Sequence, residues 1–277
     1  MFPSTIRAKT SRCNVSCFFQ RGDRESIVFI HGFGASKGTF LEAFQFGEFQ
    51  ALTMVAPDLV GFGDSDKPSD FSYLMKDQAK ILGEVFDTLC LAQFNLVAHS
   101  MGGIIGIELA EMIPDRISSF INVEGNITSE DCTMSRRVAD MSARHFSKEG
   151  FEQLRHSLAQ ESEKNHDEIL RAYLNDFSKA TPESLHKSSL STVHESDSGD
   201  LLERFAHLPM YKCYVYGEKN KGVFTAETEL RRRKIPLFYI SGSGHSMMKE
   251  NTEEFYTLVL NIIHHESRKR QNGVAST

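Results

Sequence analysis

Asn95–Gly103, with the sequence NLVAHSMGG, is the stretch of this chain that decides its fold. A short apolar run ends abruptly at Ser100, and small residues and a helix-forming segment follow at once. This pattern is typical of a strand that turns sharply into a helix, where bulky side chains two residues before and after the turn would clash. Ala98 and Gly102 occupy those two positions. The stretch therefore predicts a strand, a tight turn at a serine, and a helix.

Strand-like and helix-like segments alternate along the chain on both sides of this turn. Continuous apolar runs over 26–30, 54–56 and 94–98 are expected of strands buried on both faces of a parallel sheet. A stripe of apolar residues at helical spacing over 75–89 predicts a helix packed on that sheet. The alternation predicts an α/β fold with a doubly wound, mostly parallel sheet.

One long segment interrupts the alternation. Residues 127–208 lack a buried strand pattern and have the pattern of polar, charged helices. We therefore expect a core domain of residues 1–126 and 209–277, with residues 127–208 inserted as a helical cap. Ser188–Gly199, rich in serine, is expected to be a loop. Four residues have the sequence context of a helix N-cap: Ser72, Asn165, Thr181 and Asn251.

Composition and charge narrow the function classes. The chain has 277 residues and a net charge of −6, which disfavours nucleic acid as a partner. No segment approaches the roughly 18 apolar residues of a membrane span, and the N-terminus lacks the apolar core of a signal peptide. The five cysteines are scattered without metal-ligand spacing, so we expect reduced thiols in a cytoplasmic protein. The basic cluster Arg268–Arg270 is expected to lie in a frayed, solvated tail, and assembly as a homodimer stays open.

Residues with catalytic chemistry follow several of the predicted strands. Ser100 ends one strand, and its hydroxyl is inert near neutral pH unless a base takes its proton. His245 follows the last predicted strand in the segment GSGH (242–245), and His31 begins the segment HGFG (31–34) after the strand at 26–30. Asp58 lies in a glycine-punctuated loop after the strand at 54–56. Because parallel strands bring their C-terminal ends to one edge of a sheet, these residues are expected to meet there.

In this order, the four segments resemble the signatures of the α/β-hydrolase family, with Ala98 in place of the first glycine of the nucleophile elbow. The resemblance covers the whole chain except the insertion. It implies that Ser100 is the nucleophile and His245 the general base. It also implies that the backbone N–H groups of Phe33 and Met101 form an oxyanion hole. His31, Gly32, Asp58 and Gly102 are expected to shape the surrounding loops.

The third member of the triad departs from the commonest pattern of the family. Most members place an aspartate after the penultimate strand, where this chain has Asn220, and an amide cannot stabilise the imidazolium as a carboxylate can. Two carboxylates could replace it: Glu124, at the end of the strand after the elbow helix, and Glu218, in the same loop as Asn220. We favour Glu124, because a carboxylate at a buried strand end needs a reason to be there.

The resemblance implies hydrolysis of a carboxylic ester, thioester or lactone through an acyl-Ser100 intermediate. The substrate would be a small apolar acyl compound, and no metal or organic cofactor is implied. A serine nucleophile disfavours the branches of the family that use aspartate to attack epoxides or haloalkanes. Two alternatives stay open: a carbon–carbon bond hydrolase or lyase with the same triad, and a small-molecule receptor built on the same fold.

Overall fold

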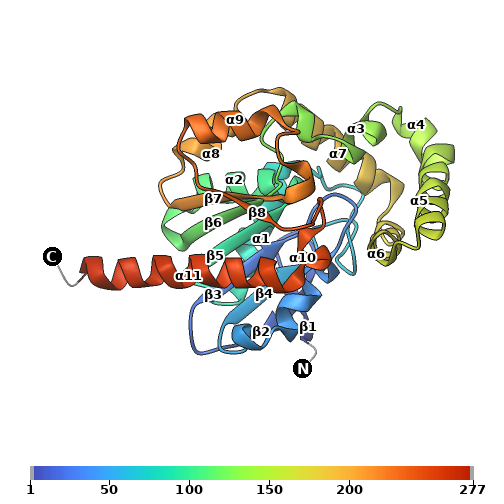
Figure 1. Cartoon of the computed structure of the whole chain (residues 1–277). Helices are drawn as coiled ribbons and strands as arrows, with labels where there is room; N and C mark the ends of the chain where they lie inside the picture. Colours follow the sequence, from blue (N-terminus) through green and yellow to red (C-terminus); the bar gives the residue numbers. More distant parts are fainter. Residues whose placement is uncertain (1–2, 275–277) are drawn as a thin grey trace.

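The computed structural model describes residues 3–274 of the chain and confirms an α/β fold around one mixed sheet (Figure 1). The order of the eight strands is β1-β2-β4-β3-β5-β6-β7-β8. Strands β1 and β2 pair antiparallel with their neighbours, and the strands from β4 to β8 are parallel to one another. The strands are β1 (Ser4–Lys9), β2 (Asn14–Gln20), β3 (Ser26–Ile30), β4 (Thr53–Pro57), β5 (Phe94–His99), β6 (Ile117–Val123), β7 (Tyr211–Gly217) and β8 (Leu237–Ile240).

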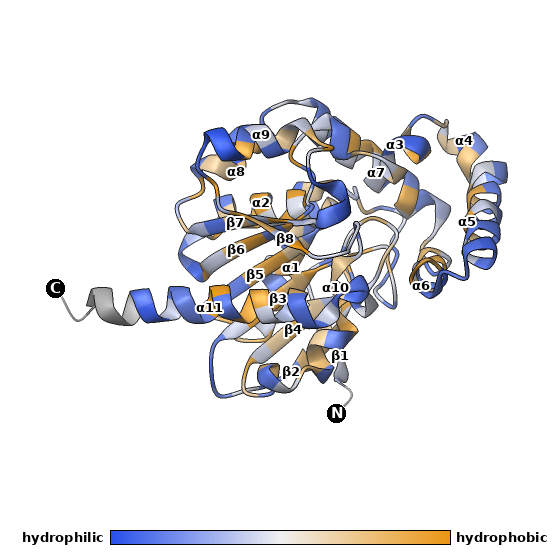
Figure 2. Ribbon diagram, in the orientation of Figure 1, coloured by the Kyte–Doolittle hydropathy of each residue, from blue (hydrophilic) through white to orange (hydrophobic). Residues whose placement is uncertain are grey.

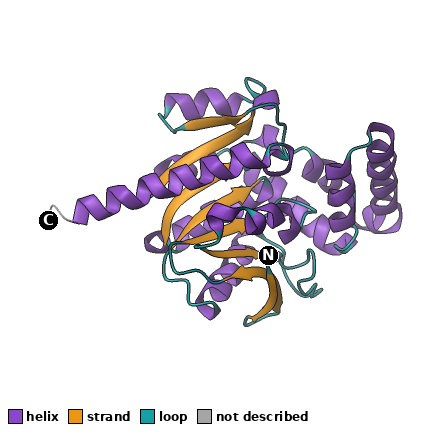
Figure 3. Ribbon diagram, turned by 60° about the horizontal axis from the view of Figure 1, so that its bottom comes forward, coloured by secondary structure: helices purple, strands orange, loops and turns teal. Residues whose placement is uncertain are grey.

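Helices cover both faces of the sheet, so its central strands are apolar on both sides. Val28 and Ile30 of β3 pack in the layer that holds α1 (Met75–Thr88) and α2 (Met101–Met112). Ile27 and Phe29 point the other way, toward α11 (Thr252–Val274) and the short helix η1 (Lys37–Gln45). Figure 3 shows α11 running across one face of the sheet. Side chains alternate along a strand, so burial on both faces requires the continuous apolar run seen in the sequence.

Between β6 and β7, across residues 127–208, all of the regular structure is helical, and this segment is called the insertion below. It leaves the sheet after β6 and returns at β7. Its outer helix, α5 (Phe151–Asn165), is mostly hydrophilic (Figure 2). In Figure 1 the helices α4 and α5 lie farthest from the sheet. The helices of the insertion are α3 (Met134–Ala139), α4 (Ala143–His145), α5 (Phe151–Asn165), α6 (Glu168–Phe177), α7 (Pro182–Asp197) and α8 (Leu201–His207), and α9 (Thr225–Arg232) and α10 (Met247–Glu250) follow in the core.

Two of the predicted helix N-caps are confirmed, and a third is wrong. The Thr181 side chain accepts a hydrogen bond from the backbone of α7, and the Asn251 side chain accepts one from the first turn of α11. Asn165 instead lies in the last turn of α5. The cap of α6 is Asp167, whose carboxylate accepts from the N–H of Leu170 at 2.8 Å. The capping signal is therefore present but displaced by two residues, because α5 continues farther than its sequence suggests.

Ser72 and the predicted loop Ser188–Gly199 are corrected together. Helix α1 begins at Met75, after Ser72, and the Met75 N–H donates to the Ser191 hydroxyl of α7 at 3.1 Å. Most of Ser188–Gly199 belongs to α7, which continues to Asp197. Serines on α7 are buried because their small side chains allow the insertion to pack closely on the core. A residue distant in sequence, Ser191, therefore binds the N-terminus of α1 in place of Ser72.

The ends of the chain also differ from expectation. The sequence pattern does not predict β1, which pairs along β2 at the edge of the sheet and buries little besides Ala8. The basic cluster Arg268–Arg270 lies within α11, so the expectation of a frayed tail is wrong there. Within this cluster, Lys269 binds Glu266 one turn earlier and lies over the ring of Tyr211. Within residues 3–274, every helix is too short or too polar to cross a membrane.

Candidate active site

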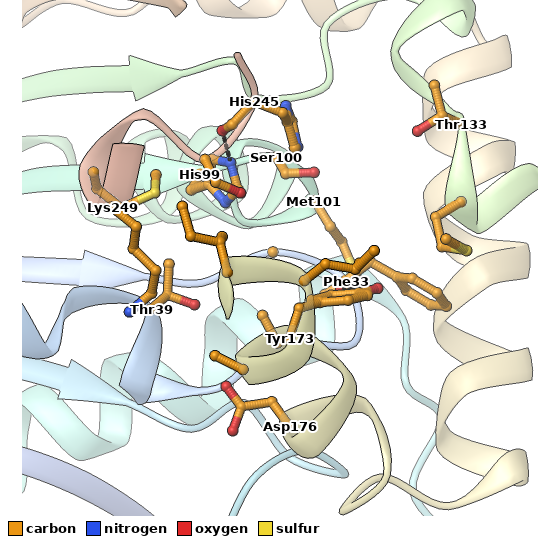
Figure 4. A pocket seen from close by; sticks show the side chains of 18 of the residues that line it. Phe33, Thr39, His99, Ser100, Met101, Thr133, Tyr173, Asp176, His245 and Lys249 are labelled. Carbon is orange, nitrogen blue, oxygen red and sulfur yellow. Dashed lines mark hydrogen bonds between the residues drawn. The ribbon is translucent and has the colours of Figure 1, made fainter. Parts of the chain in front are cut away.

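Ser100 lies at the turn between β5 and α2, as the sequence predicts. Its backbone has φ 55° and ψ −127°, a strained combination for a residue other than glycine. The Ser100 N–H donates to the carbonyl of Val123 at 3.1 Å, and its carbonyl accepts from the N–H of Gly103 at 2.7 Å. These bonds hold the strained turn, which presents the serine at the N-terminus of α2 and at the wall of a cavity (Figure 4).

The small residues on either side of Ser100 have different neighbours. A Cβ added to Gly102 would lie 2.7 Å from the carbonyl oxygen of His31 and 2.8 Å from that of Ile30, so only glycine fits. Ala98 is fully buried, and the methyl group faces Gly106 of α2, where an added Cβ would be 3.3 Å away. Alanine is accommodated at the first small position because a glycine lies opposite it.

His245 and Glu124 are brought together, as the preferred assignment expects. The Nδ1 atom of His245 is 2.7 Å from Oε2 of Glu124. Burial favours the neutral acid, but hydrogen bonds from His245, Asn220 and the N–H of Gly217 outweigh it and lower the pKa of Glu124. The ionised carboxylate only accepts hydrogen bonds, so Nδ1 of His245 carries the proton and Nε2 is left as the basic atom.

Glu218, the alternative acid, lies elsewhere in the structure. Its carboxylate accepts from the N–H of Gly242 at 2.8 Å and so braces the loop that leads to His245. Asn220 has a role that the sequence reasoning missed. Its amide nitrogen lies 3.0 and 2.9 Å from the two oxygens of Glu124. Asn220, at the position where most of the family has its acid, thus holds the carboxylate of Glu124, which follows β6. Its position in the loop was the sequence signal that could have indicated this role.

His99 is a second residue that the sequence reasoning missed. Its Nε2 atom is 2.9 Å from the backbone carbonyl of His245, as the dashed line in Figure 4 marks, and the two rings lie 4.5 Å apart. A carbonyl only accepts, so His99 donates from Nε2. Burial holds the pKa of His99 well below its usual value, which keeps the ring neutral beside His245. Nothing in the sequence around Ser100 signals this contact between segments far apart in the chain.

The backbone N–H groups of Phe33 and Met101 are the expected oxyanion donors. Met101 is the first residue of α2, where unpaired N–H groups and the helix dipole favour negative charge. Phe33 belongs to the loop after β3, and both residues line the cavity beside Ser100. Among residues 3–274, neither N–H donates to another protein group. Gly32 allows the close approach, because a Cβ there would lie 2.9 Å from Cβ of Ser100.

His31 and Asp58 make their hydrogen bonds within the loops around the site. His31 is buried; its Nδ1 donates to the carbonyl of Gly32 at 2.8 Å, and its Nε2 accepts from the N–H of Leu59 at 3.0 Å. Burial lowers the pKa of His31. The buried Asp58 carboxylate accepts from the ammonium of Lys37 at 2.6 Å and from its N–H at 2.7 Å. Both side chains use their hydrogen bonds within the protein and none on the cavity.

A cavity of about 480 Å³ joins these groups to the helical insertion. One side of it is lined by apolar side chains, among them Phe33 and Met101 of the core and Met134, Ile169 and Leu170 of the insertion. Met141 of the insertion packs against Gly150, outside the cavity wall. The insertion therefore supplies apolar side chains to the lining of the cavity that contains Ser100.

Charged side chains around the cavity are predominantly acidic. Asp131, Asp167, Asp176 and Glu250 line it together with one lysine, Lys249. The Lys249 ammonium is already bound to Glu42 at 3.0 Å and to the carbonyl of Gly38 at 3.1 Å. In the described part of the chain, the cavity wall therefore offers no lysine or arginine that is free to bind a negatively charged group.

Comparisons with curated proteins cover parts of the chain. The probable lysophospholipase BODYGUARD 5 of Arabidopsis thaliana is 38% identical over 101 residues, which are 34% of this chain and 23% of that protein. An uncharacterized protein of Mycobacterium tuberculosis is 27% identical over 139 residues, 50% of this chain and 40% of that protein. The chain thus spans less than half the length of these relatives.

Solved structures resemble nearly the whole chain. An N-acyl homoserine lactonase complexed with N-butanoyl homoserine has a TM-score of 0.75 at 19% identity, covering 95% of this chain and 97% of that chain. An esterase from Thermogutta terrifontis has a TM-score of 0.74 at 21% identity, covering 95% and 99%. At these identities the likeness shows the fold.

The family model described as alpha/beta hydrolase fold matches residues 25–257. The strained turn at Ser100, the parallel strands that carry it and this match over most of the chain agree: the protein belongs to the α/β-hydrolase family.

Proposed function

We propose that the protein is a serine hydrolase that cleaves a carboxylic ester, thioester or lactone through an acyl-Ser100 intermediate. The observation that carries this proposal is the hydrogen bond of 2.7 Å between Nδ1 of His245 and the buried Glu124 carboxylate, at the rim of the cavity that contains Ser100. This contact leaves Nε2 of His245 as a base on the cavity side. A base held in one tautomer by an ionised carboxylate is what a serine nucleophile requires.

The proposed reaction has two steps of the same kind. Nε2 of His245 takes the proton of the Ser100 hydroxyl as its oxygen attacks the acyl carbon, and Glu124 stabilises the imidazolium that forms. The N–H groups of Phe33 and Met101 stabilise the tetrahedral oxyanion. Collapse of this intermediate breaks the bond to the leaving group, which takes the proton from Nε2. Water then attacks the acyl-Ser100 ester in the same way and releases the acid.

The helical insertion at residues 127–208 is proposed to act as a cap over this chemistry, with residues 1–126 and 209–277 as the catalytic domain. Its residues Met134, Ile169 and Leu170 form the apolar wall of the cavity. An apolar wall that excludes water strengthens the electrostatic interactions with the oxyanion and binds an apolar acyl chain. A small apolar acyl compound is therefore the proposed substrate class.

A panel of acyl esters, thioesters and lactones tests the proposal, with wild type compared to Ser100→Ala. We expect turnover of at least one class in the wild type, covalent labelling by a fluorophosphonate, and loss of both in Ser100→Ala. Labelling without turnover of any panel member, after a single burst of acylation, would favour a receptor that retains its nucleophile. Turnover that survives in Ser100→Ala would refute the acyl-serine mechanism.

A further inference from the structure

Helix α6 of the insertion lies directly on the loop that carries the Phe33 N–H. The hydroxyl of Tyr173, on α6, donates to the backbone carbonyl of Phe33 at 3.1 Å. The next residue, Gly34, has φ +68°, and a Cβ added to it would lie 2.7 Å from the Tyr173 hydroxyl and 2.6 Å from the ring of Phe177. Two side chains of α6 thus fill the space beside the Phe33–Gly34 peptide, and one of them binds it.

The same end of α6 makes further polar contacts with the core. The Asp176 carboxylate lies near Ser36, the residue that caps η1 after this loop. Just past the helix, the Lys179 ammonium lies 3.8 Å from Asp64 of the core. Away from this end, α6 packs chiefly on α5, and both helices lie apart from the sheet in Figures 1 and 3. The C-terminal half of α6 is therefore a main attachment of this helix pair to the core.

Residues from both halves of α6 also line the cavity. Ile169, Leu170 and Ala172 line it, and the ring of Tyr173 continues that wall below Phe33 in Figure 4. A single helix of 10 residues therefore lines the space for the acyl chain, with Ile169 and Leu170 near its N-terminal end, and binds the expected oxyanion loop through Tyr173. Because a short helix moves nearly as a rigid rod, contacts at one end bear on the position of the other.

We propose that Tyr173 is a positioning residue that couples filling of the apolar side of the cavity to the geometry of the oxyanion hole; this rests on the proposed function. An acyl chain that reaches Ile169 and Leu170 holds α6 against the core. The Tyr173 hydroxyl then fixes the Phe33 carbonyl, and with it the backbone that presents the Phe33 N–H to the oxyanion. Binding energy from the remote end of the acyl chain thereby raises the rate of the chemical step.

The test compares Tyr173→Phe with wild type on p-nitrophenyl acetate, butyrate and hexanoate, measured as acylation rate in single turnovers and as kcat and KM. In wild type we expect the acylation rate to rise with acyl length. In Tyr173→Phe we expect the acylation rate to fall about tenfold for the hexanoate, which is the effect of losing one hydrogen bond, and by less than about twofold for the acetate. The KM of the hexanoate is expected to stay within about twofold of the wild-type value.

Tyr73→Phe is the matched control, because the Tyr73 hydroxyl also donates to a backbone carbonyl, that of Pro68 at 2.9 Å, but outside the cavity. It should leave the dependence on acyl length unchanged. An equal loss on all three esters in Tyr173→Phe, a loss confined to KM, or no loss would overturn the coupling.

Amide hydrogen exchange of the segment 32–38 reports the contact without relying on activity, and we expect this exchange to be faster in Tyr173→Phe than in wild type. If wild type shows no Ser100-dependent turnover, the proposed function fails while this exchange measurement still tests the contact.

Discussion

Glu124 shows how a buried carboxylate is kept ionised at the end of a strand. Its backbone has φ 40°, and three donors surround its oxygens: His245, the amide of Asn220 and the N–H of Gly217. Each donor lies at the C-terminal edge of the sheet. Burial alone would favour the neutral acid, so the lowered pKa of Glu124 depends on these contacts being made together.

The first prediction separates the two carboxylates considered for the triad. Glu124→Gln should reduce kcat on the best ester of the panel by about 10³-fold or more, because an amide neither holds His245 in the correct tautomer nor stabilises its imidazolium. Glu218→Gln should change kcat by less than about threefold, since Glu218 contacts only the backbone leading to His245. Steady-state kinetics of both variants checks this, and the opposite ranking would make Glu218 the acid.

A rescue variant sharpens the same assignment. Adding Asn220→Asp to Glu124→Gln puts a carboxylate within hydrogen-bond distance of the side chain at position 124. We expect kcat of this double variant to be at least about tenfold higher than that of Glu124→Gln alone, because the imidazolium again has a nearby anion. Equal rates in the single and double variants would mean that position 220 cannot reach His245.

The second prediction follows from the direction of the Glu124 pKa shift. The pKa is lowered in the folded state, so below the usual value of about 4.5 the unfolded chain binds more protons than the folded chain. Stability from Glu124 is therefore fully present above that value and is lost as the pH falls through the folded pKa. Replacing it by Gln should flatten the pH dependence of the unfolding free energy below about pH 4.5, by at most about 1.4 kcal/mol per pH unit. Urea unfolding of both proteins across pH 3–7 measures the slopes, and parallel slopes would contradict the shift.

At the scale of elements, the junction of β5 with α2 depends on a close approach between backbones. Helix α2 starts against the end of β3, and Gly102 is the point of contact. The atoms that a side chain would meet are carbonyl oxygens of Ile30 and His31, which cannot rotate away as a flexible side chain could. The strand, the turn and the helix therefore fit one another only with glycine at this position.

The third prediction tests that fit. Gly102→Ala should destabilise the fold by about 3 kcal/mol, because the added methyl group forces the two backbones apart. Gly47→Ala is a suitable control, since a Cβ there has no neighbour within 4 Å, and its effect should stay within about 1 kcal/mol. Urea unfolding followed by circular dichroism compares the two, and equal stabilities would show that the junction can relax.

Across the whole molecule, charge is distributed unevenly around the cavity. Four carboxylates line it, and its one lysine is bound to Glu42. A substrate that carries a negative charge on its acyl chain would lose its hydration on entering and find no free cation in exchange. We therefore expect the proposed reaction to favour uncharged acyl groups.

The fourth prediction uses two p-nitrophenyl esters of similar shape, the 4-methylpentanoate and the hemisuccinate. We expect kcat/KM to be at least about tenfold higher for the neutral 4-methylpentanoate, because the unpaired carboxylate of the hemisuccinate costs more than about 1.4 kcal/mol to bind. Raising the ionic strength should narrow the difference, since salt screens the repulsion from the lining carboxylates. Equal or reversed preference would place a usable cation in the cavity.

The sequence by itself determined the parallel part of the sheet, the alternation of its strands and helices, and two residues, Ser100 and His245, that line one cavity at its edge. Those features follow from local signals, because apolar periodicity and a small-residue turn depend on near neighbours in the chain. Only the tertiary structure decided which carboxylate contacts His245, that Asn220 holds Glu124, and that Ser191 caps α1. It also placed Tyr173 on the Phe33 loop. Each of these contacts joins residues 96 or more positions apart along the chain, where the packing of the insertion and the strand order set the distances.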